Sequence, residues 1–190
     1  MGYIYSGSCV YDRKNVSGYG TEENPPLVAL YTNHATDGLE RQCLAYSTDG
    51  VHFAKNHSQS GDTESGLRDF RDPKAFYHPV KDCWSLVLAA GDRVHFYSSE
   101  DLKHWEKTGE FGPEGNHSPG IWECPDLFRV KTEDGDSLWV LVVSMLMPTE
   151  NGRSRTQYFS RGLRWRPFYG LQKNQRNQCG WISVSTIMPE

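Results

Sequence analysis

Two short stretches of this sequence place an aromatic residue, a carboxylate and a proline at the start of a strand-like run. They are Phe70–Phe76 (FRDPKAF) and Trp122–Phe128 (WECPDLF). Two carboxylates in one pocket are what glycoside hydrolysis needs, because one protonates the leaving oxygen and the other attacks or stabilises an oxocarbenium-like centre. We therefore treat Asp72 and Glu123 as candidate catalytic residues.

Glu123 has neighbours that suit a proton donor. Trp122, Cys124 and Pro125 offer little hydration, which favours the neutral carboxylic acid. The alternative is that Glu123 forms an ion pair with a lysine or arginine and is structural. The spacing of the residues leaves both interpretations open.

Arg71 and Asp72 also admit two interpretations. They could form a local ion pair that holds a loop, or a clamp in which a carboxylate and a guanidinium bind the hydroxyl groups of a sugar. Lys74 is interpreted as a solvated strand residue.

The elements that must position these residues are short strands, because helical periodicity is nearly absent and Gly, Asn, Asp and Pro separate the apolar runs. The predicted strands are Tyr3–Tyr11, Leu27–Thr32, Gln42–Ser47, His52–Lys55, Phe70–His78, Trp84–Ala89, Arg93–Ser98, Trp105–Phe111, Trp122–Val130, Leu138–Met145 and Thr156–Phe159. A further, incomplete group of strands is predicted near Phe168 and Trp181.

The strand groups repeat. Tyr46 and Tyr97 begin similar turn sequences 51 residues apart, and Pro73 and Pro125 are 52 apart. Four strands per unit at this period is typical of a β-propeller, whereas a β-sandwich would lack the repeated motifs. The first strand of each blade lies nearest the propeller axis. We therefore expect Tyr5–Ser8, Arg71–Pro73 and Glu123–Pro125 to meet in a central cavity.

Composition limits the classes of partner. The net charge of −4 gives no reason to expect nucleic acid or an anionic membrane as partner. The seven histidines and five cysteines show no metal-binding spacing, so neither a metal nor another cofactor is predicted. The cysteines are expected to be buried free thiols. The abundant aromatic residues suit sugar rings and sheet cores equally well.

At this point the motifs carry a family likeness. The chain resembles glycoside hydrolase family 32, the invertases, levanases and inulinases that act on β-D-fructofuranosides. The matching stretches are Tyr5–Asp12, Asn15–Gly18, Leu27–His34, Gln42–Gly50, Phe70–Phe76, Phe96–Trp105, Phe111–Pro113, Ile121–Phe128 and Thr156–Phe159. This resemblance implies part of a five-bladed β-propeller, of which about three blades are present, and a retaining mechanism on sucrose, inulin or levan.

The resemblance also implies a role for each site residue. Glu123 would be the general acid/base, and Asp72 would stabilise the transition state by bonding fructosyl hydroxyls. Substrate-binding roles would fall on Arg71, Ser6, Ser8, Cys124 and Trp122. Cys124 is further expected to lie behind Glu123 and to influence its proton affinity.

One departure concerns the nucleophile, which in the family is an aspartate in an Asn-Asp-Pro-Asn-Gly motif that these 190 residues do not contain. The chain is therefore expected to be inactive alone, as a truncated fragment of an enzyme from either an extracellular or a cytoplasmic compartment. A non-catalytic sugar-binding propeller, or pseudoenzyme, is the alternative.

A second departure concerns the tail. Residues 1–160 are assigned to the partial catalytic propeller and residues 161–190 to a divergent tail. One allowed codon choice for Arg161–Pro167, read one base later, encodes the family-like sequence Gly-Asp-Phe-Asp-Gly-Val. We therefore hypothesise a frameshift after Phe159, with an ordinary divergent basic loop as the alternative.

Overall fold

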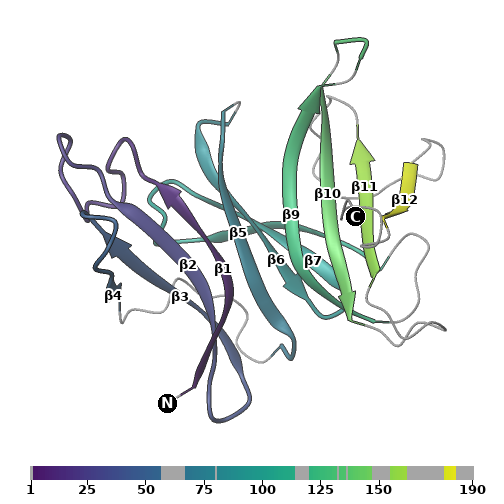
Figure 1. Ribbon diagram of the computed structural model, residues 1–190, viewed down its shortest axis with the longest axis horizontal. Helices are drawn as coiled ribbons and strands as arrows, with labels where there is room; N and C mark the ends of the chain where they lie inside the picture. The colour runs from purple at the N-terminus through teal and green to yellow at the C-terminus, as the bar shows by residue number, and fades with distance from the viewer. Residues whose placement is uncertain are drawn as a thin grey trace, which may run out of the picture.

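The computed structural model describes residues 2–56, 67–79, 81–113, 120–131, 133–135, 137–146, 155–161 and 178–182. Within these ranges the regular elements are all β-strands, arranged in three antiparallel sheets of four strands each (Figure 1). The all-β prediction is therefore confirmed. Among the described residues, no helix is long and apolar enough to cross a membrane.

Each sheet is a simple meander in which strands adjacent in sequence are adjacent in space. The first sheet contains β1 (Tyr3–Tyr11), β2 (Leu27–His34), β3 (Glu40–Ser47) and β4 (Ala54–Asn56). The second contains β5 (Phe70–His78), β6 (Cys83–Ala90), β7 (Arg93–Ser99) and β8 (Glu106–Phe111). The third contains β9 (Ile121–Lys131), β10 (Ser137–Leu146), β11 (Arg155–Arg161) and β12 (Gln178–Ile182).

The predicted strands agree with these bounds to within a few residues, with two corrections. The strand predicted from His52 begins only at Ala54, because the backbone N–H of His52 donates to Asp49 Oδ1 at 2.8 Å and so belongs to a turn. Trp181 does not begin a fourth group of strands. It lies in β12, which completes the third sheet by pairing with β11. Phe168 lies outside the described residues.

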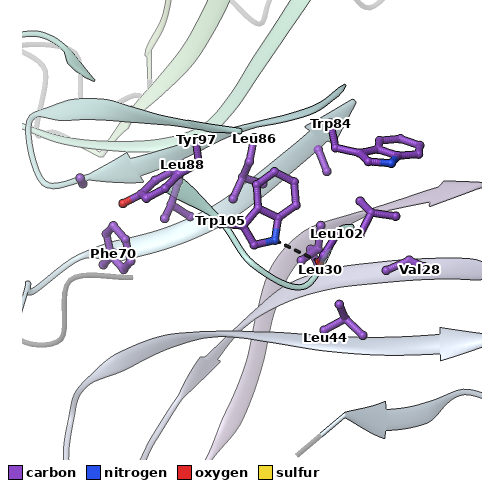
Figure 2. Close-up of a cluster of buried hydrophobic side chains, with 12 residues drawn as sticks. Val28, Leu30, Leu44, Phe70, Trp84, Leu86, Leu88, Tyr97, Leu102 and Trp105 are labelled. Atoms are coloured by element: carbon purple, nitrogen blue, oxygen red, sulfur yellow. Dashed lines mark hydrogen bonds between the residues drawn. The ribbon is translucent and has the colours of Figure 1, made fainter. Parts of the chain in front are cut away.

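A hydrophobic core joins the first sheet to the second (Figure 2). Alternate residues of β2 and β3 point into it, because side chains of a strand alternate between its two faces. The buried residues are Val28, Leu30, Leu44, Phe70, Ala75, Trp84, Leu86, Leu88, Ala90, Tyr97, Leu102 and Trp105. Each large side chain buried here contributes about 1.5–3 kcal/mol of transfer free energy.

A second core joins the second sheet to the third. Strand β6 serves both cores: Leu86 and Leu88 face the first sheet, whereas Val87 between them faces the third. This explains why β6 reads as a continuous apolar run rather than an alternating one. The second core contains Val87, Val94, Phe96, Phe111, Trp122, Leu127, Leu141, Val143, Met145 and Phe159.

The first strands of the three sheets lie next to one another, with β5 between β1 and β9 (Figure 1). Ser8 on β1 ties two of them together, because its Oγ donates to the carbonyl of Pro73 at 2.9 Å and accepts from the N–H of Ala75 at 2.8 Å. The described sheets do not close into a ring. The arrangement brings the three predicted motifs to one place.

Candidate active site

The same backbone irregularity occurs in all three first strands. Each carries a β-bulge, in which two residues lie opposite one residue of the neighbouring strand. The bulged pairs are Tyr5-Ser6 opposite Thr32, Asp72-Pro73 opposite Leu88, and Cys124-Pro125 opposite Val143. Bulges re-aim side chains next to active sites, and here they coincide with the three motifs singled out from the sequence.

Two of the bulges contain a residue in the left-handed region. Asp72 has φ of 63° and Cys124 has φ of 47°. This conformation costs a non-glycine residue roughly 1–2 kcal/mol, although aspartate tolerates it better than most. Pro73 and Pro125 follow directly, where their missing N–H is tolerated because the ladder is already interrupted.

The Asp72 side chain is almost buried, with 7% of the residue exposed, and its carboxylate is held from the next sheet. Its Oδ2 accepts the backbone N–H of Cys124 at 2.8 Å, and its own N–H donates to Thr32 Oγ1 at 3.0 Å. These bonds fix the position of the carboxylate. The thiol of Cys124 also lies near enough to hydrogen-bond this carboxylate.

A buried polar chain supports the backbone around Asp72. Thr32 Oγ1 donates to Gln42 Oε1 at 2.9 Å, and Gln42 Nε2 donates to the carbonyl of Phe70 at 2.7 Å. Thr32 is 0% exposed and Gln42 is 1% exposed, so each bond satisfies a group that burial would otherwise penalise. The first sheet thereby braces the bulge of the second.

Arg71 is the hub of the charged cluster. Its Nε and Nη2 lie 2.9 Å from the two carboxylate oxygens of Glu40, and its Nη1 donates to Glu123 Oε1 at 2.8 Å. Its Nη2 also bonds Asp69 Oδ1. Burial lowers the pKa of the Arg71 guanidinium, but the bonds and charge of Glu40 outweigh this and leave the pKa above its usual value. Arg71 therefore stays charged and holds three carboxylates from three strand regions.

Three contacts across the seam between β5 and β9 join residues that are 52 positions apart. They are the Arg71–Glu123 ion pair, the bond from the N–H of Cys124 to Asp72, and the Lys74–Asp126 ion pair at 2.9 Å. Equivalent positions of the sequence repeat therefore face each other. Lys74 was predicted to be a solvated residue, but it is partly covered and bridges the two sheets because Asp126 lies opposite it.

Of three predicted substrate-binding residues, Ser6 is accessible to a ligand, whereas Ser8 and Trp122 are occupied in structural contacts. Ser6 is exposed on the β1 bulge and lies near enough to hydrogen-bond the thiol of Cys124. Ser8 is instead occupied in bonds to the backbone of β5. Trp122 is 1% exposed and stacks on Phe159 in the second core, so its side chain is not available to a ligand.

Cys124 lies against Asp72 rather than only behind Glu123. Burial raises the pKa of the Cys124 thiol, and the charge of Asp72 raises it further. Its predicted influence on Glu123 stays a prediction. Cys9 and Cys124 are exposed, which corrects the prediction of buried thiols, because both lie on edge strands of their sheets. The four cysteines with described side chains are free, as predicted.

The ion pair of Glu123 with an arginine, one of the two interpretations left open from the sequence, is present with Arg71. The sequence did not reveal that Glu40 and Asp69 are further partners of Arg71. Glu40 carries the only available signal, since it falls on the same inward face of β3 as Gln42 and Leu44. Tyr5 was also missed: its ring stacks on His34 with centroids 5.0 Å apart, and the guanidinium carbon of Arg71 lies 5.9 Å from its centroid.

The cluster as a whole suits a neutral substrate that becomes positive as it reacts. Three carboxylates, from Glu40, Asp69 and Glu123, bond the guanidinium of Arg71, and the carboxylate of Asp72 accepts from the residue that follows Glu123. Glu123 keeps 26% of its side chain exposed and so is accessible. Fixed negative charge of this kind favours an oxocarbenium-like centre. Among the described residues, no group of three His, Cys, Asp or Glu is placed to hold a metal ion.

Comparison with known proteins agrees with the motifs. Residues 1–182 match the sequence model of the glycosyl hydrolases family 32 N-terminal domain. The chain belongs to glycosyl hydrolase family 32. It is 41% identical over 161 residues to a levanase of Bacillus subtilis (strain 168), a match that covers 83% of this chain and 24% of the levanase.

Solved structures of the family 32 enzymes superpose well. A fructofuranosidase of Schwanniomyces occidentalis complexed with fructose gives a TM-score of 0.79 at 29% identity, covering 95% of this chain and 35% of that protein. An exo-inulinase of Aspergillus awamori gives 0.77 at 27% identity, covering 95% and 40%. The three sheets are therefore blades of a β-propeller, as the repeat predicted. The family 32 chain spans well under half the length of these relatives.

Proposed function

We propose that this chain forms one side of a fructoside-hydrolysing site, in which Glu123 is the general acid/base and Asp72 binds fructosyl hydroxyls. The observation that carries the proposal is the pair of bonds that joins the two motifs. Arg71 bonds Glu123 at 2.8 Å, and Asp72 accepts the N–H of Cys124 at 2.8 Å. These bonds hold two carboxylates from separate sheets near each other, which supports a pair of the kind that glycoside hydrolysis requires.

The two carboxylates are suited to different tasks. Asp72 is nearly buried and fixed at Oδ2, so its carboxylate would be a rigid acceptor for a sugar hydroxyl. Glu123 is more exposed and is held only by Arg71 in the described part of the chain. A fructosyl hydroxyl that accepts from Arg71 would leave Glu123 Oε1 facing the leaving oxygen, where proton transfer contributes about 10²–10⁴-fold to the rate.

The substrate class comes from the relatives, which are named levanases, exo-inulinases and an invertase. We propose terminal β-D-fructofuranosides of levan, inulin or sucrose as substrates and a retaining mechanism. The nucleophilic aspartate that the family resemblance implies is not among these 190 residues. We therefore propose that the 190-residue chain alone binds fructosides without hydrolysing them.

A chimera tests this function. Residues 3–161 of this chain replace the matched segment of the Bacillus subtilis levanase, and fructose release from levan is measured. We expect an active chimera, and a fall of about 10²–10⁴-fold in kcat for Glu123→Gln. Lys74→Met is the matched control, because Lys74 also bridges β5 and β9 but bonds neither carboxylate. A chimera with a cooperative thermal transition but no fructose release would contradict the proposal.

The chain by itself gives the complementary result. Incubated with sucrose, inulin or levan, the 190-residue protein should release no fructose. It should still bind fructose, with amide chemical-shift changes around Asp72 and Cys124. Turnover by the isolated chain would show that the nucleophile lies among these residues.

A further inference from the structure

A second cluster of aromatic and charged side chains lies at the far end of the first strands. Tyr11 is the last residue of β1, and Tyr77 is one residue from the end of β5. A strand rises about 3.3 Å per residue, so Tyr77 lies roughly 20 Å along β5 from Arg71. This second cluster is therefore separate from the candidate active site, which contains Asp72 and Glu123.

These side chains line a groove between the loop after β1 and the hairpin that joins β5 to β6. The groove has a volume of about 420 Å³, which is within the usual range of small-ligand sites. Its walls include Tyr11, Lys14, Tyr77, Asp82, Trp84 and Glu100. The function proposed above uses none of these residues.

The groove has a supported aromatic wall. Tyr77 packs edge-on against Trp84, with ring centroids 5.5 Å apart. Trp84 is only 9% exposed and lies at the end of the first core opposite Phe70 (Figure 2). Tyr77 and Tyr11 remain 40% and 54% exposed. The core therefore anchors the wall, and exposed ring faces are left for a ligand.

Polar acceptors lie beside the rings. Asp82 Oδ1 accepts from Lys14 Nζ at 2.9 Å and from the hydroxyl of Tyr77, whereas no bond to Oδ2 is seen within the described residues. The Tyr77 hydroxyl and then Lys14 hold the pKa of Asp82 below its usual value, so it remains an acceptor. Glu100 makes no hydrogen bond or ion pair with any described residue.

We propose that this groove is a second carbohydrate-binding site. It holds a remote segment of the fructan whose terminus is cleaved at the candidate active site. The ring faces would pack against C–H groups, and the carboxylates would accept hydroxyls. Asp82 and Glu100 offset Lys14 and Arg13 in the lining, so the groove offers no net positive charge to hold an anionic ligand. A purely apolar ligand would strip water from the Lys14–Asp82 pair. The choice of a fructan rests on the proposed function.

The test is an amide chemical-shift titration of the whole 190-residue chain with levan oligosaccharides, with dextran oligosaccharides as the control. We expect shifts at Tyr77 and at residues 82–84 with levan oligosaccharides alone. Tyr77→Ala should weaken this binding about tenfold, the loss of roughly one good ring contact. Phe128→Ala is the matched control, because Phe128 is also 40% exposed but does not line the groove.

The possible outcomes test binding in the groove and binding at the candidate active site separately. Shifts confined to residues 71–74 and 123–126 would overturn the proposal that the groove binds carbohydrate and would leave the proposed function intact. Shifts at the groove alone would support carbohydrate binding in the groove and count against fructoside binding at the candidate active site. Equal shifts with dextran, or none at the groove, would overturn the proposal. If Tyr77→Ala gives the poorly dispersed spectrum of an unfolded chain, the test is repeated with Asp82→Asn, because the side chain of Asp82 is exposed.

Discussion

The segments Arg71–Pro73 and Glu123–Pro125 have the same backbone conformation but carry different side chains at equivalent positions. In each, a charged residue precedes a left-handed residue and a proline within a bulge. The left-handed residue is the carboxylate Asp72 in one segment and the thiol Cys124 in the other. The preceding residues, Arg71 and Glu123, bond each other. A duplicated scaffold thus presents two carboxylates in unequal settings, one fixed and one exposed.

The first way to break this arrangement is to remove Arg71. Arg71→Met leaves Glu40, whose side chain is 3% exposed, without its cation. Breaking such a buried pair costs about 3–5 kcal/mol, which urea unfolding of the chain should show. The double variant Arg71→Met/Glu40→Gln should recover most of that loss, because no buried charge is left unpaired. A cost below about 1 kcal/mol for Arg71→Met would contradict the account.

Glycine at the two left-handed positions should have opposite effects. Asp72→Gly removes the acceptor for the N–H of Cys124 and should destabilise the chain by about 1–3 kcal/mol. Cys124→Gly removes an exposed side chain and relieves a positive φ, so it should stabilise the chain by about 0.5–1 kcal/mol. Thermal unfolding of both variants checks this. Stability changes of the same sign would contradict the claim that the side chain of Asp72 stabilises its bulge and that of Cys124 does not.

The contact between Asp72 and Cys124 should be visible in thiol chemistry. The charge of Asp72 adds to burial in raising the pKa of Cys124, so less thiolate is present at pH 8 than in an ordinary thiol. Asp72→Asn removes that charge, lowers the pKa and should speed alkylation about three- to tenfold near pH 8. The difference should vanish well above the pKa, where both proteins are thiolates. Peptide mapping after iodoacetamide treatment isolates Cys124, and Cys83 serves as the internal control.

The smallest effect is expected at the third contact of the seam. The Lys74–Asp126 pair has side chains 39% and 41% exposed, so Lys74→Met should cost less than about 1 kcal/mol. That cost should shrink further in 1 M salt, where exposed charges are screened. A large cost that does not depend on salt would show that Lys74 acts through packing instead.

The sequence predicted the strands because the apolar runs and turn residues report local structure. The repeat of 51–52 residues then predicted that the motifs meet. It could not show that Glu40 is a partner of Arg71, because these two residues become neighbours only when the first two sheets pack. It also could not show that Trp122 turns into the core: an aromatic beside a catalytic motif looks the same whether it faces a ligand or a sheet.

The left-handed conformations were invisible for a different reason. Glycine usually marks such positions, and neither Asp72 nor Cys124 is glycine. The following prolines were the only local sign, and they indicated a strand start rather than a bulge. The hypothesis of a frameshift after Phe159 stays a prediction for the coding sequence to test. The backbone of β12 shows only that residues 178–182 complete the third sheet.

The central claim is that Glu123 supplies the proton to the leaving oxygen. In the levanase chimera, Glu123→Gln should reduce kcat about 10²–10⁴-fold on levan, whose leaving group needs a proton. Glu123 would also act as the base in the second step of a retaining mechanism, so the two substrates are compared by kcat/KM, which reports the first step. On β-D-fructofuranosyl fluoride, whose leaving group needs no proton, the reduction in kcat/KM should be at least tenfold smaller than on levan, about 1.4 kcal/mol or more of difference between the two substrates. An equal loss on both substrates would contradict the claim, because it would make Glu123 a structural partner of Arg71.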